Sequence, residues 1–285
     1  MENVQPIQAQ KVPLESLGSL IKNAWSLMLE NATNLFILSF SQVAISTILI
    51  NTKTIDSIWG SLLSFLLTLF IPTALILSLT KSQTGEKLEL KNIIARALRL
   101  LPSFFLLALL TGLFVAGGFV LLIVPGIIFA IWSSFSVYIL ITEGIKGFSA
   151  LIKSSAYTSN YVLELLGRSI VIGLITGIPL FSAKIGATGS ILIQTPILDS
   201  IITGITAPFA ICFSFLLFKN LVAIKTTSVV IPEKRPLLIK IFVAIGLAAL
   251  IFIPLFLGIS NPSETKEWPM IDSERLKLNL EGPRN

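Results

Sequence analysis

Long uncharged apolar runs alternate with short charged segments along this chain. The stretch Leu100–Thr142 contains no charged side chain. One helical crossing of about 30 Å of hydrocarbon needs roughly 20 residues, so this stretch has room for two crossings and a short turn. Pro125 and Gly126 stand where the turn is needed, because proline does not extend a helix and glycine tolerates the backbone angles of a reversal. The pattern predicts a helical hairpin, Leu101–Val124 and Ile127–Thr142, that turns at these two residues.

The same criterion predicts seven membrane spans. They are Asn31–Asn51, Ser57–Thr80, Leu101–Val124, Ile127–Thr142, Val162–Ser182, Pro196–Phe218 and Ile241–Ser260. The apolar runs are continuous and do not alternate, which favours helices over a β-barrel. The loop 185–194 is itself apolar, so a full fifth span and a re-entrant or interfacial seat for this loop both stay open.

An internal repeat accompanies the spans. Leu14, Leu17, Ile21, Ala24 and Met28 form an apolar stripe at helical spacing before the first hairpin. Similar amphipathic segments begin at Leu90 and Phe148. We therefore expect an all-α membrane protein of three units, each a surface helix followed by a hairpin. The units are 14–80, 88–142 and 148–219, followed by an extra span at 241–260, so that 1–260 forms one domain and 261–285 a polar tail.

Composition agrees with lipid as the main solvent. The chain is 54% hydrophobic and 13% charged, whereas a soluble domain is about 25% charged. Outside the tail, every lysine and arginine except Lys53 and Lys184 falls on one predicted side of the membrane. The positive-inside rule places that side, and the N-terminus with it, in the cytoplasm. We therefore expect a multi-pass protein of the plasma (inner) membrane. With seven spans, its C-terminal tail lies on the outer side of that membrane.

Catalytic and metal-binding signatures are few. The chain has no histidine, and its one cysteine, Cys212, lies in an apolar run. No paired carboxylates, nucleophile with a base, zinc-ligand cluster or phosphate-binding glycine loop is recognisable. We expect no enzyme activity, no cofactor and no metal.

One carboxylate has a specific structural interpretation. Glu143 ends the fourth span, where the negative end of the helix dipole disfavours an anion. It therefore needs a cation, and four lie on the same predicted side: Lys146, Lys153, Arg96 and Arg99. Gly144 would cap the helix, and Gly147 would turn the chain along the membrane. We interpret Glu143-Gly144 as a latch between span and surface helix; a functional carboxylate is the alternative.

Several short motifs carry a family resemblance. They are Ile123-Val124-Pro125-Gly126-Ile127-Ile128, Glu143-Gly144, Gly147-Phe148-Ser149-Ala150-Leu151 and Lys153-Ser154-Ser155. Together they resemble a group of prokaryotic integral membrane proteins that includes the membrane domain of some glycerophosphoryl diester phosphodiesterases. The resemblance covers roughly residues 88–220 and implies a helical membrane protein. The catalytic phosphodiesterase barrel has no counterpart here, so no activity is carried over.

Small and polar residues within the spans indicate how the helices pack. Gly173 and Gly177 form a GxxxG pattern, which suits close contact within the chain or, alternatively, between two copies. Gln42, Ser46, Ser133 and Ser136 should face the bundle, either packed or lining a polar cavity. We expect Gln42 to hydrogen-bond another helix, because an unpaired amide in hydrocarbon costs several kcal/mol.

The sequence favours a non-enzymatic membrane protein with a structural, scaffolding or membrane-homeostasis role. The alternative is a transporter-like protein that moves a small amphiphile or peptide through a cavity between the repeat units. The expected partner is the lipid bilayer, with anionic headgroups on the cytoplasmic side. A homo-oligomer is the alternative for contacts between chains, and no nucleic acid is expected.

Overall fold

All the regular structure that the computed structural model describes is α-helical. It describes residues 13–52, 57–83, 85, 89–185, 196–225 and 235–260. The helices are α1 Leu17–Glu30, α2 Ala32–Asn51, α3 Ile58–Gln83, α4 Leu90–Leu121, α5 Ile123–Ser133, α6 Ser136–Glu143, α7 Gly147–Thr158, α8 Val162–Ile185, α9 Pro196–Lys225 and α10 Arg235–Ser260. Seven segments in these ranges are long and apolar enough to span a membrane: α2, α3, α4, α5 with α6, α8, α9 and α10. The all-helical membrane fold is therefore confirmed.

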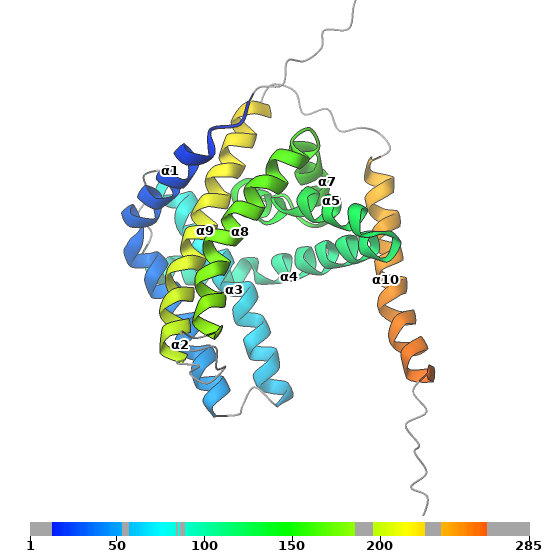
Figure 1. The fold of residues 1–285 in the computed structure, drawn as a ribbon, viewed down its shortest axis with the longest axis horizontal. Helices are drawn as coiled ribbons and strands as arrows, with labels where there is room; N and C mark the ends of the chain where they lie inside the picture. Colours follow the sequence, from blue (N-terminus) through cyan, green and yellow to red (C-terminus); the bar gives the residue numbers. More distant parts are fainter. Residues whose placement is uncertain are drawn as a thin grey trace, which may run out of the picture.

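The helix axes run along two main directions (Figure 1). The helices α2, α8 and α10 run from the upper to the lower end of the view, and α3 and α9 return. The antiparallel pair α4 and α5 runs across them, and α10 crosses this pair far from α9. The hairpin predicted from the apolar pattern exists, but it lies crosswise to its neighbours.

The reversal between α4 and α5 falls earlier than predicted. Leu122 is the extended residue between the two helices, with φ −162° and ψ 157°, whereas Pro125 and Gly126 lie in the first turns of α5. Proline is tolerated there because the first backbone N–H groups of a helix have no intrahelical acceptor. A Cβ on Gly126 would lie 2.5 Å from the Phe119 ring, so this glycine serves close approach of α4 and α5 and does not form the turn itself.

Two of the three expected surface helices are separate helices. The helix α1 packs on α9, where Trp25 meets Phe209 edge-to-face at 6.0 Å between ring centroids, and Leu20 and Ala24 are fully buried. The helix α7 covers α5 and α6. The predicted second surface helix, 90–101, is instead the first part of α4, which continues through Pro102 into the span.

The fourth span is broken in the middle. The helix α5 ends at Ser133, and α6 begins at Ser136. The hydroxyl of Ser134, the residue after α5, donates to Ile131 O of that helix at 2.8 Å. The buried Phe135 N–H donates to Ser154 Oγ of α7 at 3.2 Å. Serine hydroxyls compete for backbone carbonyls and loosen helices, and α7 supplies the acceptor that the broken helix lacks.

The last span is more than an addition to the bundle. A Cβ on Gly117 of α4 would lie 2.0 Å from Phe242 O, and a Cβ on Gly246 of α10 would lie 2.0 Å from Leu113 O. The two backbones therefore touch where α10 crosses α4. At its N-terminal end, Arg235 donates to Ser155 O of α7 at 3.0 Å and stands over the Trp132 ring at 5.4 Å. Two separate contacts thus fix α10 in place.

Candidate functional site

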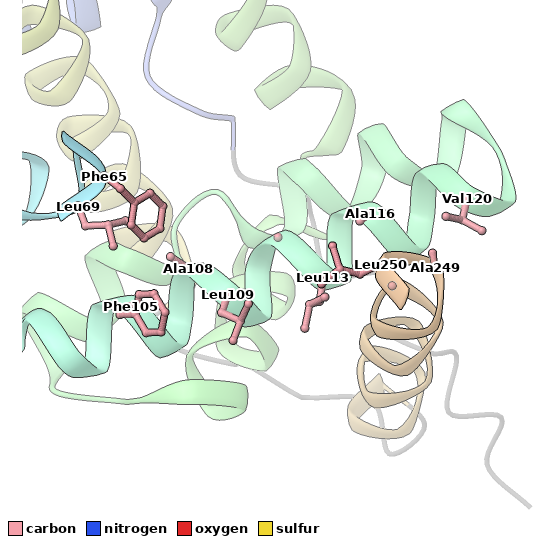
Figure 2. Close-up of a pocket in the computed structure, with 12 residues that line it drawn as sticks. Phe65, Leu69, Phe105, Ala108, Leu109, Leu113, Ala116, Val120, Ala249 and Leu250 are labelled. Atoms are coloured by element: carbon pink, nitrogen blue, oxygen red, sulfur yellow. The ribbon is translucent and has the colours of Figure 1, made fainter. Parts of the chain in front are cut away.

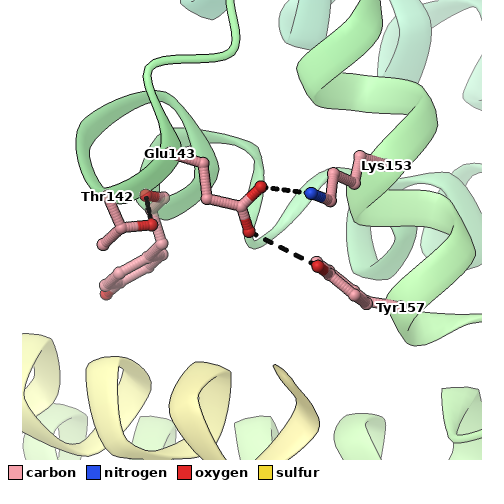
Figure 3. A network of polar contacts seen from close by, with 5 residues as sticks. Thr142, Glu143, Lys153 and Tyr157 are labelled. Carbon is pink, nitrogen blue, oxygen red and sulfur yellow. Dashed lines mark hydrogen bonds and ion pairs between the residues drawn. The ribbon is translucent and has the colours of Figure 1, made fainter. Parts of the chain in front are cut away.

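The end of α6 carries a small polar cluster (Figure 3). Gly144 terminates α6 in the left-handed conformation, with φ +70°, and Gly147 takes φ +58° where α7 begins. These two residues turn the chain so that α7 folds back over Glu143. The Glu143 carboxylate then accepts from Lys153 Nζ in an ion pair and from Tyr157 Oη at 3.4 Å. Of the four cations that the sequence offered, Lys153 is the partner.

Electrostatics hold this cluster in one protonation state. The hydrogen bond to Glu143 raises the pKa of Lys153. Burial, together with the Glu143 charge, raises the pKa of Tyr157. Both groups therefore stay protonated at neutral pH, and neither is poised to exchange a proton there. The arrangement is suited to joining α6 to α7.

The four polar residues predicted to face the bundle line neither of the two pockets described below. Ser133 and Ser136 are buried, and they donate to Ala130 O at 3.1 Å and Ser133 O at 2.7 Å on their own segment. Gln42 and Ser46 are half-buried on α2. Gln42 makes no hydrogen bond to the part of the chain that the structure describes, so its expected bond to another helix is absent there. The amide is only half-buried, so it lies at the edge of the contacts of α2 and not between two packed helices.

The glycine pattern on α8 is not at a helix contact among the described residues. A Cβ on Gly173 or Gly177 would meet nothing within 4 Å. The tight glycine contacts lie elsewhere, at Gly117 with Gly246 and at Gly204, whose added Cβ would lie 2.6 Å from the Phe40 ring. The pair Gly117-Gly246 was not recognisable in sequence, because its two members come from helices with other elements between them.

An apolar groove runs beneath α4 (Figure 2). It has a volume of about 510 Å³ and opens between α3 and α10. Phe65 and Leu69 of α3 close one end, Phe105 and Leu109 of α4 follow, and Leu250 of α10 stands at the other end. The groove exists because α4 lies crosswise and holds the two upright helices apart. None of the four predicted cavity residues lines it.

A second pocket, of about 470 Å³, lies between the ends of α3 and α6 and the first turns of α4. Lys81, Arg96 and Arg99 line it together with two threonines. The sequence offers Arg96 and Arg99 both as partners for Glu143 and as contacts for anionic headgroups, and the structure does not pair them with Glu143. Within the described ranges, no group of three or more histidine, cysteine, aspartate or glutamate side chains is placed to hold a metal ion.

Two predicted features lie outside the described residues: the apolar loop at 186–194 and the tail 261–285.

Comparison with known protein families, curated proteins and solved structures finds no match. The resemblance to the phosphodiesterase-associated membrane domains therefore stays a prediction.

Proposed function

We propose that this chain is a non-enzymatic membrane protein with a structural, scaffolding or membrane-homeostasis role, exerted through helix packing and lipid contact. The observation that carries the proposal is the burial and hydrogen bonding of Ser133 and Ser136. A transport path for a polar solute needs polar groups that face water at mid-membrane depth. Here both hydroxyls are buried and bonded to backbone carbonyls of their own segment.

The surface chemistry supports lipid as the partner. Apolar side chains on α3, α4, α8 and α10 are extensively exposed, among them Trp59 at 78%, Leu109 at 46%, Ile178 at 60% and Leu250 at 61%. Lys146 and Lys153 lie at and on α7, and Arg235 donates to Ser155 O of the same helix. We place the end that carries α7 in the cytoplasm of a plasma membrane protein, next to anionic headgroups, by the positive-inside rule.

The apolar groove favours a second candidate function. A volume of about 510 Å³ open between α3 and α10 has the size and lining to hold an acyl chain or another amphiphile. A protein that moves such a molecule would present a route to the midplane from one side. The packed serines do not line the groove, so they report on a different route, an aqueous path through the bundle, which would have to make them accessible.

The test is cysteine accessibility in native membranes. Cys212, which is fully buried, is first replaced by alanine, and single cysteines are then introduced as Ser133→Cys and Ser136→Cys. We expect neither to react with a charged, membrane-impermeant thiol reagent. Ser149→Cys, at an exposed position of α7, is the matched control that should react. Labelling at Ser133 or Ser136 from one side would overturn the scaffold proposal in favour of transport.

A further inference from the structure

Three cations converge on the pocket between α3, α4 and α6. Lys81 comes from the last turn of α3, and Arg96 and Arg99 lie on one face of α4, three residues apart. None of the residues that line the pocket is acidic. Like charges so close together repel one another, and the arrangement is stable only where a counter-charge or abundant water compensates.

Protein groups do not supply that counter-charge to the arginines. Arg96 and Arg99 form no hydrogen bond or ion pair with the described part of the chain, and both are exposed. Glu143 follows Thr142 directly, but its carboxylate is already engaged by Lys153 and Tyr157. The guanidinium groups therefore have their donors available for an anion from outside the chain. Arginine donors match the oxygens of phosphate in a bidentate geometry.

The other residues that line this pocket indicate which kind of anion it can bind. Leu77, Leu100 and Ile141 give the pocket an apolar side. The hydroxyls of Thr80 and Thr142 donate to Ile76 O at 2.8 Å and Tyr138 O at 2.7 Å, so toward the pocket they offer only acceptor lone pairs. Anion binding thus depends on Arg96 and Arg99, while the apolar side suits the glycerol and upper acyl carbons of a lipid.

We propose that this pocket binds a phosphate group, and that its source is the headgroup of an anionic phospholipid. A soluble phosphate compound shares the chemistry of the charged part but leaves the apolar side without a ligand. This inference rests on the proposed function, and it assigns the lipid contact of that function to a specific site. The two proposals fail in different experiments. Thiol labelling at Ser133 would contradict the proposed function but not lipid binding at this pocket. Absence of lipid binding at this pocket would not change the burial of Ser133 and Ser136.

The experiment uses the purified full-length chain in a nonionic detergent. Dioleoylphosphatidylglycerol is titrated in, and bound lipid is counted by native mass spectrometry. The test variant is the double substitution Arg96→Gln with Arg99→Gln. The control is Lys91→Gln, an exposed cation on the same helix that does not line the pocket. Inorganic phosphate is added as a competitor in a second arm, and thermal melting is recorded for every variant.

We expect the affinity for phosphatidylglycerol to fall about 30-fold in the double variant, roughly fivefold for each charge removed, and less than twofold in Lys91→Gln. Millimolar inorganic phosphate should not displace the lipid; if it does, the phosphate site stands and the lipid assignment is overturned. An equal loss in Lys91→Gln, or no loss in the double variant, would overturn the site itself. A lower melting temperature without a change in affinity would do the same, since the arginines would then serve only as counter-charges for the ends of α3 and α6.

Discussion

Glu143 occupies a position that isolated helix physics disfavours. Its carboxylate ends α6, where the helix dipole is negative, and a cation is needed to offset this. Lys153 lies ten residues further along the chain, yet it reaches Glu143 because Gly144 and Gly147 both adopt positive φ. A residue with a side chain is strained at such angles. The ion pair thus depends on two glycines that contribute no side chain to it and act only through the turn of the backbone.

The raised pKa of Lys153 predicts a stability effect with a defined pH dependence. Folding favours the protonated lysine, so the contribution is complete below the ordinary lysine pKa of about 10.4 and is lost as pH rises through the raised folded value. Tyr157 acts in the same direction, because its pKa is raised as well. Lys153→Met should lower the melting temperature in detergent by roughly 1–2 °C at pH 7–9, as expected for a partly exposed pair of about 0.5 kcal/mol. The difference from the unmodified chain should shrink and disappear as the pH rises through the raised pKa of Lys153.

Lys146→Met is the matched control for this prediction. Lys146 is exposed next to the same turn, and it forms no ion pair with Glu143 in the described structure. Its replacement should leave the melting temperature unchanged across the pH range. A pH-independent loss in Lys153→Met would show that the lysine acts through its aliphatic packing and not through its charge.

At the scale of elements, identical residues have opposite roles in different helices. Gly117 and Gly246 let α4 and α10 meet backbone to backbone, whereas Gly173 and Gly177 face open space on α8. A GxxxG spacing marks two small residues on one helix face, but it does not identify the helix that covers them. The contact between α4 and α10 uses one glycine from each helix, so no spacing within either helix reveals it.

Alanine substitutions separate these two kinds of glycine. Gly117→Ala should destabilise the protein by roughly 1–3 kcal/mol, because its Cβ has no room beside Phe242 O and the helices must move apart. Gly177→Ala and Gly112→Ala add a Cβ that meets nothing, and in a helix interior they should be neutral or stabilise by up to about 1 kcal/mol. Thermal melting in detergent measures all three.

Gly112 is the sharper control, since it lies on the same helix as Gly117. If Gly177→Ala proved as costly as Gly117→Ala, Gly177 would be covered by a group outside the described residues, as in the alternative of contact between two copies of the chain.

The positions of the helices were predictable from the sequence, because they depend on the length and hydrophobicity of each segment by itself. Charge-free length alone predicted the spans to within a few residues at most ends, as for Asn31–Asn51 against α2. The features that sequence could not supply arise from contacts between distant segments. The break at Ser134 requires the hydroxyl of Ser154, and the anchoring of Arg235 requires a carbonyl 80 residues earlier. The Glu143 partner was predictable only as one of four cations for the same reason.

The whole molecule derives its main asymmetry from the crosswise hairpin. Because α4 and α5 run across the upright helices, α3 and α10 are held apart beneath α4, and the apolar groove opens between them (Figures 1 and 2). The basic pocket uses an earlier part of α4. Arg96 and Phe105 are separated by about 180° around the helix at roughly 100° per residue, so the two pockets use opposite faces of α4. One helix therefore separates an apolar binding surface from a cationic one.

The orientation of the whole bundle gives a final prediction. The end that carries α7 holds exposed Lys146 and Ser149, and the opposite end holds exposed Thr52 at the end of α2 (Figure 1). From the positive-inside rule we expect the α7 end to lie in the cytoplasm. With Cys212 replaced by alanine, Thr52→Cys should react with an impermeant maleimide in intact cells, whereas Ser149→Cys should react only after permeabilisation. Both cysteines stand at exposed positions, so a difference in labelling reports the side of the membrane and not burial. The reverse pattern would invert the bundle and place the cationic pocket outside, while equal labelling in intact cells would contradict a membrane lying between the two ends.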